Sequence, residues 1–182
     1  MTMTKEELAA KLEAHAKWLK TRFTNNVEGS RADLADADLT GANLTHADLA
    51  DANLTDADLA DANLAYADLA HANLTRANLT GANLTDADLA YANLTRANLA
   101  HADLADANLT RANLTGANLT DADLADANLT RADLAYADLT DADLAYANLN
   151  IRKASPYVFD ALAAAFSAQM ALKKTRIEWM NH

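Results

Sequence analysis

A five-residue period runs without interruption through most of this chain. Alanine recurs at every fifth position from Ala32 to Ala147, and leucine recurs at every fifth position from Leu34 to Leu149. Each unit reads x-Ala-[Asp/Asn]-Leu-[Thr/Ala], and only Asn150 departs from the last choice. A fixed period is the signature of a repeat architecture, so the 24 units of residues 31–150 constrain the fold more than any other feature.

The period fits neither a regular helix nor a regular strand. Five residues turn an α-helix by about 500°, so successive leucines would not form an apolar stripe. In a continuous strand the side chains alternate between faces, so an odd step would send each leucine to the opposite face. The backbone must therefore bend once per unit. We expect Ala-[Asp/Asn]-Leu to form a short strand and [Thr/Ala]-x to form the turn, where Gly41, Gly81, Gly116 and many Asp residues lie.

The unit resembles the signature of the pentapeptide-repeat family, Ala-[Asp/Asn]-Leu-x-x, over residues 31–150. The resemblance implies an all-β solenoid, a right-handed quadrilateral β-helix in which four units make one square coil. The tract would then form about six coils with leucine and alanine along the axis, and equivalent residues of every fourth unit would stack on one face.

Residues 1–30 are expected to cap the first coil, because a solenoid exposes unpaired strand edges at its ends. The segment Thr4-Lys5-Glu6-Glu7 has the pattern of a capping box. Apolar residues near helical spacing follow it and predict a helix over about residues 5–23. We interpret His15 as a packed capping residue and not as a ligand. The apolar residues are Leu8, Leu12, Leu19 and Phe23.

Residues 151–182 predict a second helix, with Ser155 as its N-cap and Pro156 as its first residue. This helix would cap the last coil. Family members that dimerise through C-terminal elements imply a homodimer contact on its apolar side. The contact residues would be Phe159, Leu162, Phe166, Met170 and Ile177.

Charge and composition exclude several classes of function. The net charge of −11 argues against direct nucleic-acid binding and favours a basic partner or none. The absence of cysteine rules out disulfides and thiol catalysis. No apolar run reaches the length of a membrane span and the first residues do not resemble a signal peptide, so we expect a cytoplasmic protein without membrane contact.

The composition of the repeat tract is restricted in a way that drift does not produce. Residues 31–150 contain no Lys, Glu, Ser, Gln, Val, Ile or Phe. The x positions use only Asp, Gly, His, Arg and Tyr, a set that one degenerate codon could encode. We interpret the tract as a consensus or library design, with a recently duplicated natural gene as the alternative.

A convex rod offers no pocket to shift the pKa values of its carboxylates and histidines, so we predict neither catalysis, nor a cofactor, nor a metal site. The leading hypothesis is a non-catalytic structural scaffold with an acidic surface.

Two neighbouring faces of the predicted rod carry aspartates without arginine or lysine. Family members that bind gyrase and protect against quinolones imply an alternative function, a DNA mimic that binds DNA gyrase or topoisomerase IV. The net charge of −15 over residues 31–150 gives about one charge per 1.9 Å, close to about 1.7 Å for duplex DNA. The candidate partner-binding residues are Asp48, Asp61, Asp68, Asp86, Asp88, Asp103, Asp106, Asp121, Asp123, Asp126, Asp141 and Asp143.

A third hypothesis is an ice-binding solenoid, because threonines that recur at every fourth unit would form a ladder. Ala35 and Ala135 interrupt that ladder, which weakens the hypothesis. The threonines are Thr55, Thr75, Thr95 and Thr115.

Overall fold

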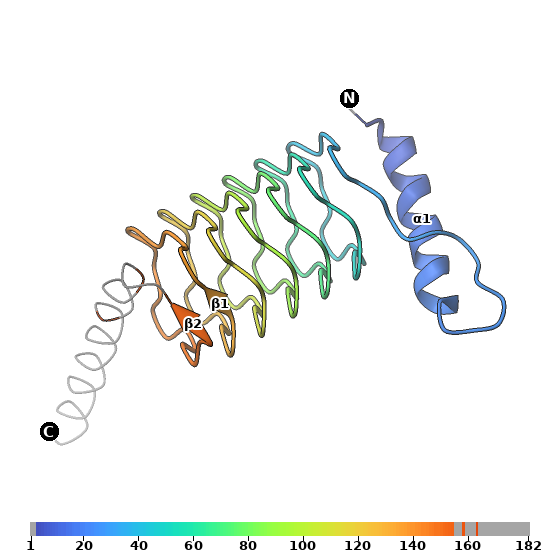
Figure 1. Ribbon diagram of the computed structural model, residues 1–182. Helices are drawn as coiled ribbons and strands as arrows, with labels where there is room; N and C mark the ends of the chain where they lie inside the picture. Colours follow the sequence, from blue (N-terminus) through green and yellow to red (C-terminus); the bar gives the residue numbers. More distant parts are fainter. Residues whose placement is uncertain (1–2, 155–157, 159–162, 164–182) are drawn as a thin grey trace, which may run out of the picture.

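The computed structural model describes residues 3–154, 158 and 163, and these form a rod with a helix across its first end (Figure 1). Helix α1 spans Lys5–Thr21 and precedes the repeat tract. Strand β1 spans Asp133–Leu134, and strand β2 spans Lys153–Ala154 and pairs with it in parallel at the far end of the rod (Figure 1). No helix in these residues is long and apolar enough to cross a membrane.

Each turn of the rod takes four units, as the resemblance to the pentapeptide-repeat family implies. Parallel bridges join the Asp or Asn at the third position of each unit to its equivalent four units later, from the Asp33–Asn53 pair to the Asn128–Asn148 pair. Strands β1 and β2 continue this register, because Asp133 pairs with Lys153. The paired segments are shorter than the three-residue strands that we predicted. The chain bends directly after each leucine, so mostly single residues form bridges.

The axis of the rod is filled by the second and fourth residues of the units. Every leucine from Leu34 to Leu144 is buried, and Leu149, in the last unit, is partly buried. The alanines are buried as well, apart from Ala42, Ala47 and Ala142, which are partly exposed near the two ends. The expected placement of leucine and alanine along the axis is confirmed.

All five backbone N–H groups of an interior unit have an acceptor, as the unit of residues 91–95 shows. The N–H groups of Tyr91 and Leu94 donate to carbonyl oxygens of the following coil, at 2.9 and 2.8 Å. The N–H of Asn93 donates to the preceding coil at 2.9 Å, and that of Ala92 closes the local turn at 3.0 Å. The fifth N–H, that of Thr95, donates to the Asn93 side-chain Oδ1 at 3.2 Å.

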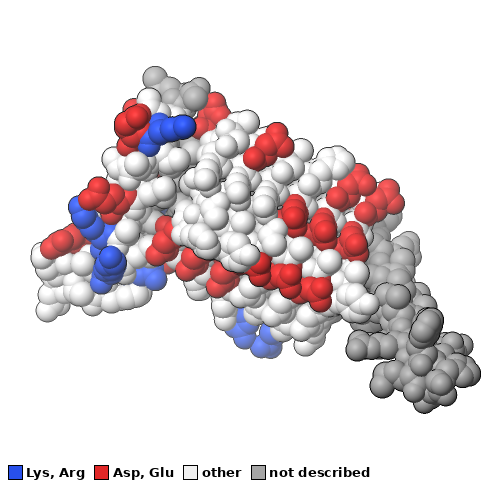
Figure 2. All heavy atoms as spheres, turned by 180° about the vertical axis from the view of Figure 1, so that it is seen from behind, with Lys and Arg blue, Asp and Glu red and all other residues white. Residues whose placement is uncertain are grey.

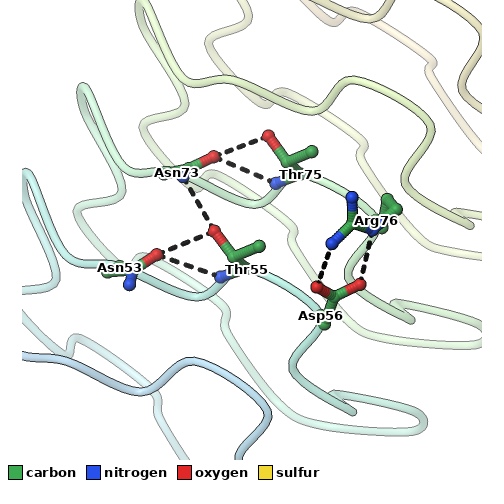
Figure 3. Close-up of polar contacts among 6 residues, drawn as sticks. All are labelled: Asn53, Thr55, Asp56, Asn73, Thr75 and Arg76. Atoms are coloured by element: carbon green, nitrogen blue, oxygen red, sulfur yellow. Dashed lines mark hydrogen bonds and ion pairs between the residues drawn. The ribbon is translucent and has the colours of Figure 1, made fainter.

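This side-chain contact recurs in all 24 units, where the Asp or Asn Oδ1 accepts the N–H two residues later at 2.8–3.4 Å. It is a local Asx-type hydrogen bond, and Asp and Asn supply the same acceptor atom. Figure 3 shows two examples, in which Asn53 and Asn73 accept from Thr55 and Thr75. The third unit position is therefore structural as well as outward-facing.

The turns place the x residues in the left-handed backbone region. Of the 24 x residues, 23 have φ between +55° and +67°, and Arg31 is the exception. Each turn is closed by the alanine N–H donating to the leucine carbonyl three residues earlier, as in a type II turn. Gly, Asp and His tolerate this region, whereas the Tyr and Arg residues adopt it because the stacked coils fix the turn.

Helix α1 begins with the predicted capping box. The Thr4 N–H donates to Glu7 Oε2 at 2.8 Å, and the Glu7 N–H donates to Thr4 Oγ1 at 3.1 Å. The helix ends at Thr21, two residues before the predicted end, and its Oγ1 accepts the N–H of Glu28 at 2.9 Å as the chain turns back. Phe23, which the sequence places in the predicted helix, lies beyond the end of α1 and is 89% exposed.

His15 is the packed residue that the sequence predicts. It is fully buried, its Nδ1 accepts the N–H of Ala32 at 3.0 Å, and its ring stacks on Trp18 with 5.6 Å between centroids. Burial lowers the pKa of His15 below its usual value, and the nearby backbone of Ala50 opposes this less strongly. A neutral imidazole therefore joins α1 to the first coil.

Gly29 lets the chain pass close to α1. Its φ is +74°, and a Cβ at this position would lie 2.1 Å from the carbonyl oxygen of Ala14. Lys11 adds a second tie between α1 and the first coil, since its Nζ donates to the Asp33 carbonyl at 2.7 Å. The predicted C-terminal helix, opening at Ser155 and Pro156, lies outside the described residues.

Replacing Asn93 by alanine should destabilise the rod, because the Thr95 N–H loses its acceptor. We expect a loss of about 1–3 kcal/mol in the free energy of unfolding, measured by chemical denaturation. Asn93→Asp keeps the acceptor and introduces a charge between two neutral neighbours, Asn73 and Asn113, so it should stay within about 0.5 kcal/mol of the parent. Equal losses in the two variants would contradict the structural role of Oδ1.

Gly29→Ala should detach α1 from the first coil, because the new Cβ meets backbone as well as an unfavourable φ. Gly41→Ala is the matched control, since its φ is +63° and no atom lies within 4 Å of the added Cβ. The free energy of unfolding of the control should fall by only about 1–2 kcal/mol, the cost of placing a residue with a Cβ in the left-handed region. We expect a larger loss at Gly29, together with a change in Trp18 fluorescence. A Gly29 variant no less stable than the control would show that the close approach is not required.

Candidate functional site: an acidic corner

The candidate partner-binding aspartates lie on two neighbouring faces of the rod and the turns beside them. Bridges place Asp48, Asp68 and Asp88 in one column and Asp103, Asp123 and Asp143 in another. The turn between these faces carries Asp86, Asp106 and Asp126, whose neighbouring coils are joined by backbone hydrogen bonds. Asp61, Asp121 and Asp141 occupy the turn on the other side of the second column.

We call these twelve aspartates the acidic corner. Figure 2 shows acidic side chains in rows along the rod, as the four-unit register requires. The structure therefore brings together the residues that the sequence predicts.

The acidic corner contains two kinds of aspartate. The six in bridged columns accept a backbone N–H through Oδ1, for example Asp123 from Ala125 at 2.9 Å and Asp143 from Ala145 at 2.8 Å. The six in turns are exposed and have φ of +55° to +60°. Charge in the columns can thus be removed by Asn without losing the acceptor, whereas charge in the turns is independent of the backbone network.

Some aspartates outside the acidic corner have cationic partners. Asp51 pairs with Arg22, and Asp56 accepts both Nε and Nη2 of Arg76 (Figure 3). The hydrogen bond from Arg76 holds the pKa of Asp56 below its usual value. Within the described part of the chain, no lysine or arginine pairs with an aspartate of the acidic corner, and His101 lies 3.7 Å from Asp121. The acidic corner is uncompensated negative surface.

The part of the chain that is described holds no candidate metal centre. No three His, Asp or Glu residues of that part are placed to hold a metal ion. The His71 ring stacks on Tyr91 with 4.8 Å between centroids, and the Arg111 guanidinium lies 5.3 Å from the Tyr91 centroid. His71, Tyr91 and Arg111 therefore form a stack of planar groups.

The threonine ladder points its hydroxyls at neighbouring side chains. The hydroxyls of Thr55, Thr75, Thr95 and Thr115 donate to the Asn Oδ1 two residues before, at 2.6–2.8 Å. Asn73 Nδ2 also donates to the Thr55 hydroxyl at 2.8 Å, which links two coils (Figure 3). The hydroxyls thus belong to the side-chain network of the rod.

The dimer-contact residues lie outside the described part of the chain. These are Phe159, Leu162, Phe166, Met170 and Ile177.

A basic hollow of about 540 Å³ near strands β1 and β2 is not among the features that the sequence predicts. The four-unit register places Arg111 and Arg131 on one face, at the same position of units one coil apart, but it does not predict that they line a hollow. Arg152 lies just beyond the last unit, so its place beside them depends on the path of the chain after Asn150. The hollow is lined by Tyr91, Arg111, Ala112, Asn113, Arg131, Asp133 and Arg152.

Comparison with known proteins finds one family signature, described as pentapeptide repeats, in eight copies at residues 30–64, 57–90, 92–130 and 122–150. Comparison with curated protein sequences gives no match.

Among solved structures, Rfr23, a pentapeptide repeat protein from the cyanobacterium Cyanothece 51142, is 35% identical over 58% of this chain and 63% of its own, with a TM-score of 0.43. The chain thus spans less than two thirds of Rfr23. A pentapeptide repeat protein from the Arabidopsis thaliana thylakoid lumen is 29% identical over 66% of this chain and 70% of its own, with a TM-score of 0.49. Full-length QnrB1, a plasmid-mediated fluoroquinolone resistance protein, is 22% identical over 77% of this chain and 74% of its own, with a TM-score of 0.39.

The uninterrupted five-residue period, the four-unit coil and the family signature over most of the chain lead to one conclusion: the protein belongs to the pentapeptide repeat family, whose fold is a right-handed quadrilateral β-helix.

Proposed function

We propose that this protein is a non-catalytic structural scaffold of about six coils, with an acidic surface and a repeat tract of consensus or library design. The observation that carries this proposal is that each position of the five-residue unit has its own structural role. The second and fourth residues fill the axis, and the third accepts the corner N–H. The x residue is left free to vary on the surface.

The variety at the x positions supports a scaffold. Asp, Gly, His, Arg and Tyr all occupy the same turn, with φ values within about 12° of one another. Every x residue except Asp51 is exposed. Because the fold makes the same use of chemically different side chains, the x positions can carry any surface pattern without a matching change in the core.

The C-terminal segment would complete the scaffold as a cap and homodimer contact. Val158 belongs to the buried core, and Leu149, Ile151 and Ala154 pack against this core. At this end the N–H of Leu139 has no acceptor among the described residues, as expected for a strand edge that needs a cover.

Repulsion within the acidic corner should limit the stability of the scaffold. Asp106 lies between Asp86 and Asp126 in its turn column, whereas Asp61 occupies an equivalent turn between Gly41 and Gly81. Asp106→Asn should therefore raise the melting temperature more than Asp61→Asn at low salt, by roughly 2 °C.

The difference between these variants should vanish in about 0.5 M NaCl, because salt screens exposed charges. Calorimetry at both salt concentrations tests this. An equal effect of the two substitutions at low salt would mean that the stacked aspartates do not repel one another measurably.

A second candidate function is DNA mimicry toward DNA gyrase or topoisomerase IV. The supporting observation is that twelve aspartates share one corner without a lysine or arginine partner in the described residues. Rows of negative charge at the coil spacing would offer a basic DNA-binding channel a surface comparable to phosphate rows.

A supercoiling assay with purified gyrase separates the two candidates. The scaffold predicts no inhibition and no protection from quinolones at low micromolar protein, whereas DNA mimicry predicts one or both. In the second case, the Asp121→Asn, Asp123→Asn, Asp141→Asn triple variant should lose the effect. The matched control is the Asp36→Asn, Asp58→Asn, Asp138→Asn triple variant, which removes the same charge from another face.

Inhibition by the parent and the control, with loss in the corner variant, would overturn the scaffold proposal. Equal loss in both variants would indicate non-specific electrostatic binding, and no inhibition by the parent would overturn DNA mimicry.

A further inference from the structure

The basic hollow is the largest departure from the acidic surface of the rod. Strand β2 adds a last rung beside β1 at the C-terminal end of the repeat tract (Figure 1). Asp133 of β1 and Arg152, which precedes β2, are among the residues that line the hollow. Its volume of about 540 Å³ is within the range of small-ligand sites. Three arginines line it, Arg111, Arg131 and Arg152.

The guanidinium groups of these three arginines have no acidic partner among the described residues. Asp133 also lines the hollow, but its carboxylate pairs with Lys153 Nζ at 3.2 Å and accepts the N–H of Ala135 at 3.2 Å. Elsewhere Arg22 and Arg76 are both paired with aspartates. The hollow therefore concentrates uncompensated positive charge in a chain whose net charge is −11.

The arginines are placed by backbone contacts and by stacking. The Arg111 N–H donates to Thr130 and the Arg131 N–H donates to Asn150, so the two residues occupy corresponding turns on adjacent coils. The Arg152 N–H donates to Ala132, which fixes its backbone beside the same coil. Tyr91 packs against the Arg111 guanidinium from one side and against His71 from the other, which restricts the motion of Arg111.

The spacing selects the kind of ligand. Adjacent coils are about 4.8 Å apart, so the backbones of Arg111 and Arg131 are separated by one such interval, and Arg152 follows on the next rung. Their side chains line the same hollow. Guanidinium forks match the oxygens of phosphate groups, and pairs of such forks favour an anion with several linked phosphates over a single one. Tyr91 has ring contacts on both sides, so the hollow offers no free aromatic face for a base or sugar.

We propose that this hollow is a binding site for a compact linear polyphosphate anion, held by Arg111, Arg131 and Arg152 with Tyr91 restraining Arg111. The site shares no residue with the acidic corner. It requires neither the scaffold nor the DNA-mimic proposal to be correct.

The test is calorimetric titration of the full-length protein with inorganic tripolyphosphate, and with orthophosphate at the same ionic strength. We expect saturable binding of tripolyphosphate and at least about tenfold weaker binding of orthophosphate, because fewer charge-assisted hydrogen bonds form. The Arg111→Gln, Arg131→Gln variant should bind tripolyphosphate at least about tenfold more weakly than the parent.

The matched control is the Arg76→Gln, Arg96→Gln variant, which changes the net charge equally on another face and should stay within about twofold of the parent affinity. Arg111→Lys with Arg131→Lys keeps the charge and loses the forks, so its affinity should fall between those of the parent and the Gln variant. Unchanged far-ultraviolet circular dichroism establishes that each variant is folded.

Equal weakening in the Gln variant and its control would overturn the proposal, since binding would then follow net charge. It would also be overturned if tripolyphosphate failed to saturate, or if the parent bound orthophosphate as tightly as tripolyphosphate.

Discussion

The structure depends on the hydrogen bond from a corner N–H to the Asp or Asn side chain two residues before it. Each coil bends once every five residues. Hydrogen bonds to neighbouring coils and within the local turn satisfy four backbone N–H groups of an interior unit, and the N–H of its fifth residue has no backbone acceptor. The Oδ1 atom satisfies that fifth group in all 24 units, from Asp33 to Asn148. An unsatisfied N–H repeated once per unit would offset much of the gain from burying one leucine.

This constraint explains why the surface charge of the rod can vary without changing its fold. Asp and Asn both supply an Oδ1 acceptor, so Asn93 and Asp123 accept the same type of backbone hydrogen bond although they differ in charge. The six column aspartates of the acidic corner use this choice, whereas its six turn aspartates, and Arg111 and Arg131 of the basic hollow, occupy the variable x positions. Because residues repeated at every fourth unit fall on one face, the four-unit register arranges charged side chains in rows along the rod.

The ends of the rod differ from its middle in the contacts that stabilise them. At the first end, buried His15 and the close approach at Gly29 attach α1 to the coil, and neither contact repeats. Arg22 adds an ion pair with Asp51 and lies over the rings of Trp18 and Phe23. At the other end, β2 continues the register by one rung after the repeat pattern has stopped. Specific tertiary contacts are thus concentrated where the period is broken.

The sequence by itself determined the bend in each unit and the inward-facing leucines, because a strict five-residue period fits neither a regular helix nor a regular strand. The four-unit coil, and with it the stacking of the acidic corner, followed from the resemblance to the pentapeptide-repeat family. The sequence also determined the start of α1, since the Thr4 and Glu7 capping box is local. Only the tertiary structure decided that the third unit position is a backbone acceptor, that Phe23 is exposed and that Arg152 joins Arg111 and Arg131. These features depend on where a neighbouring coil or a non-repeating segment lies in space, and periodicity carries no information about contacts outside the period.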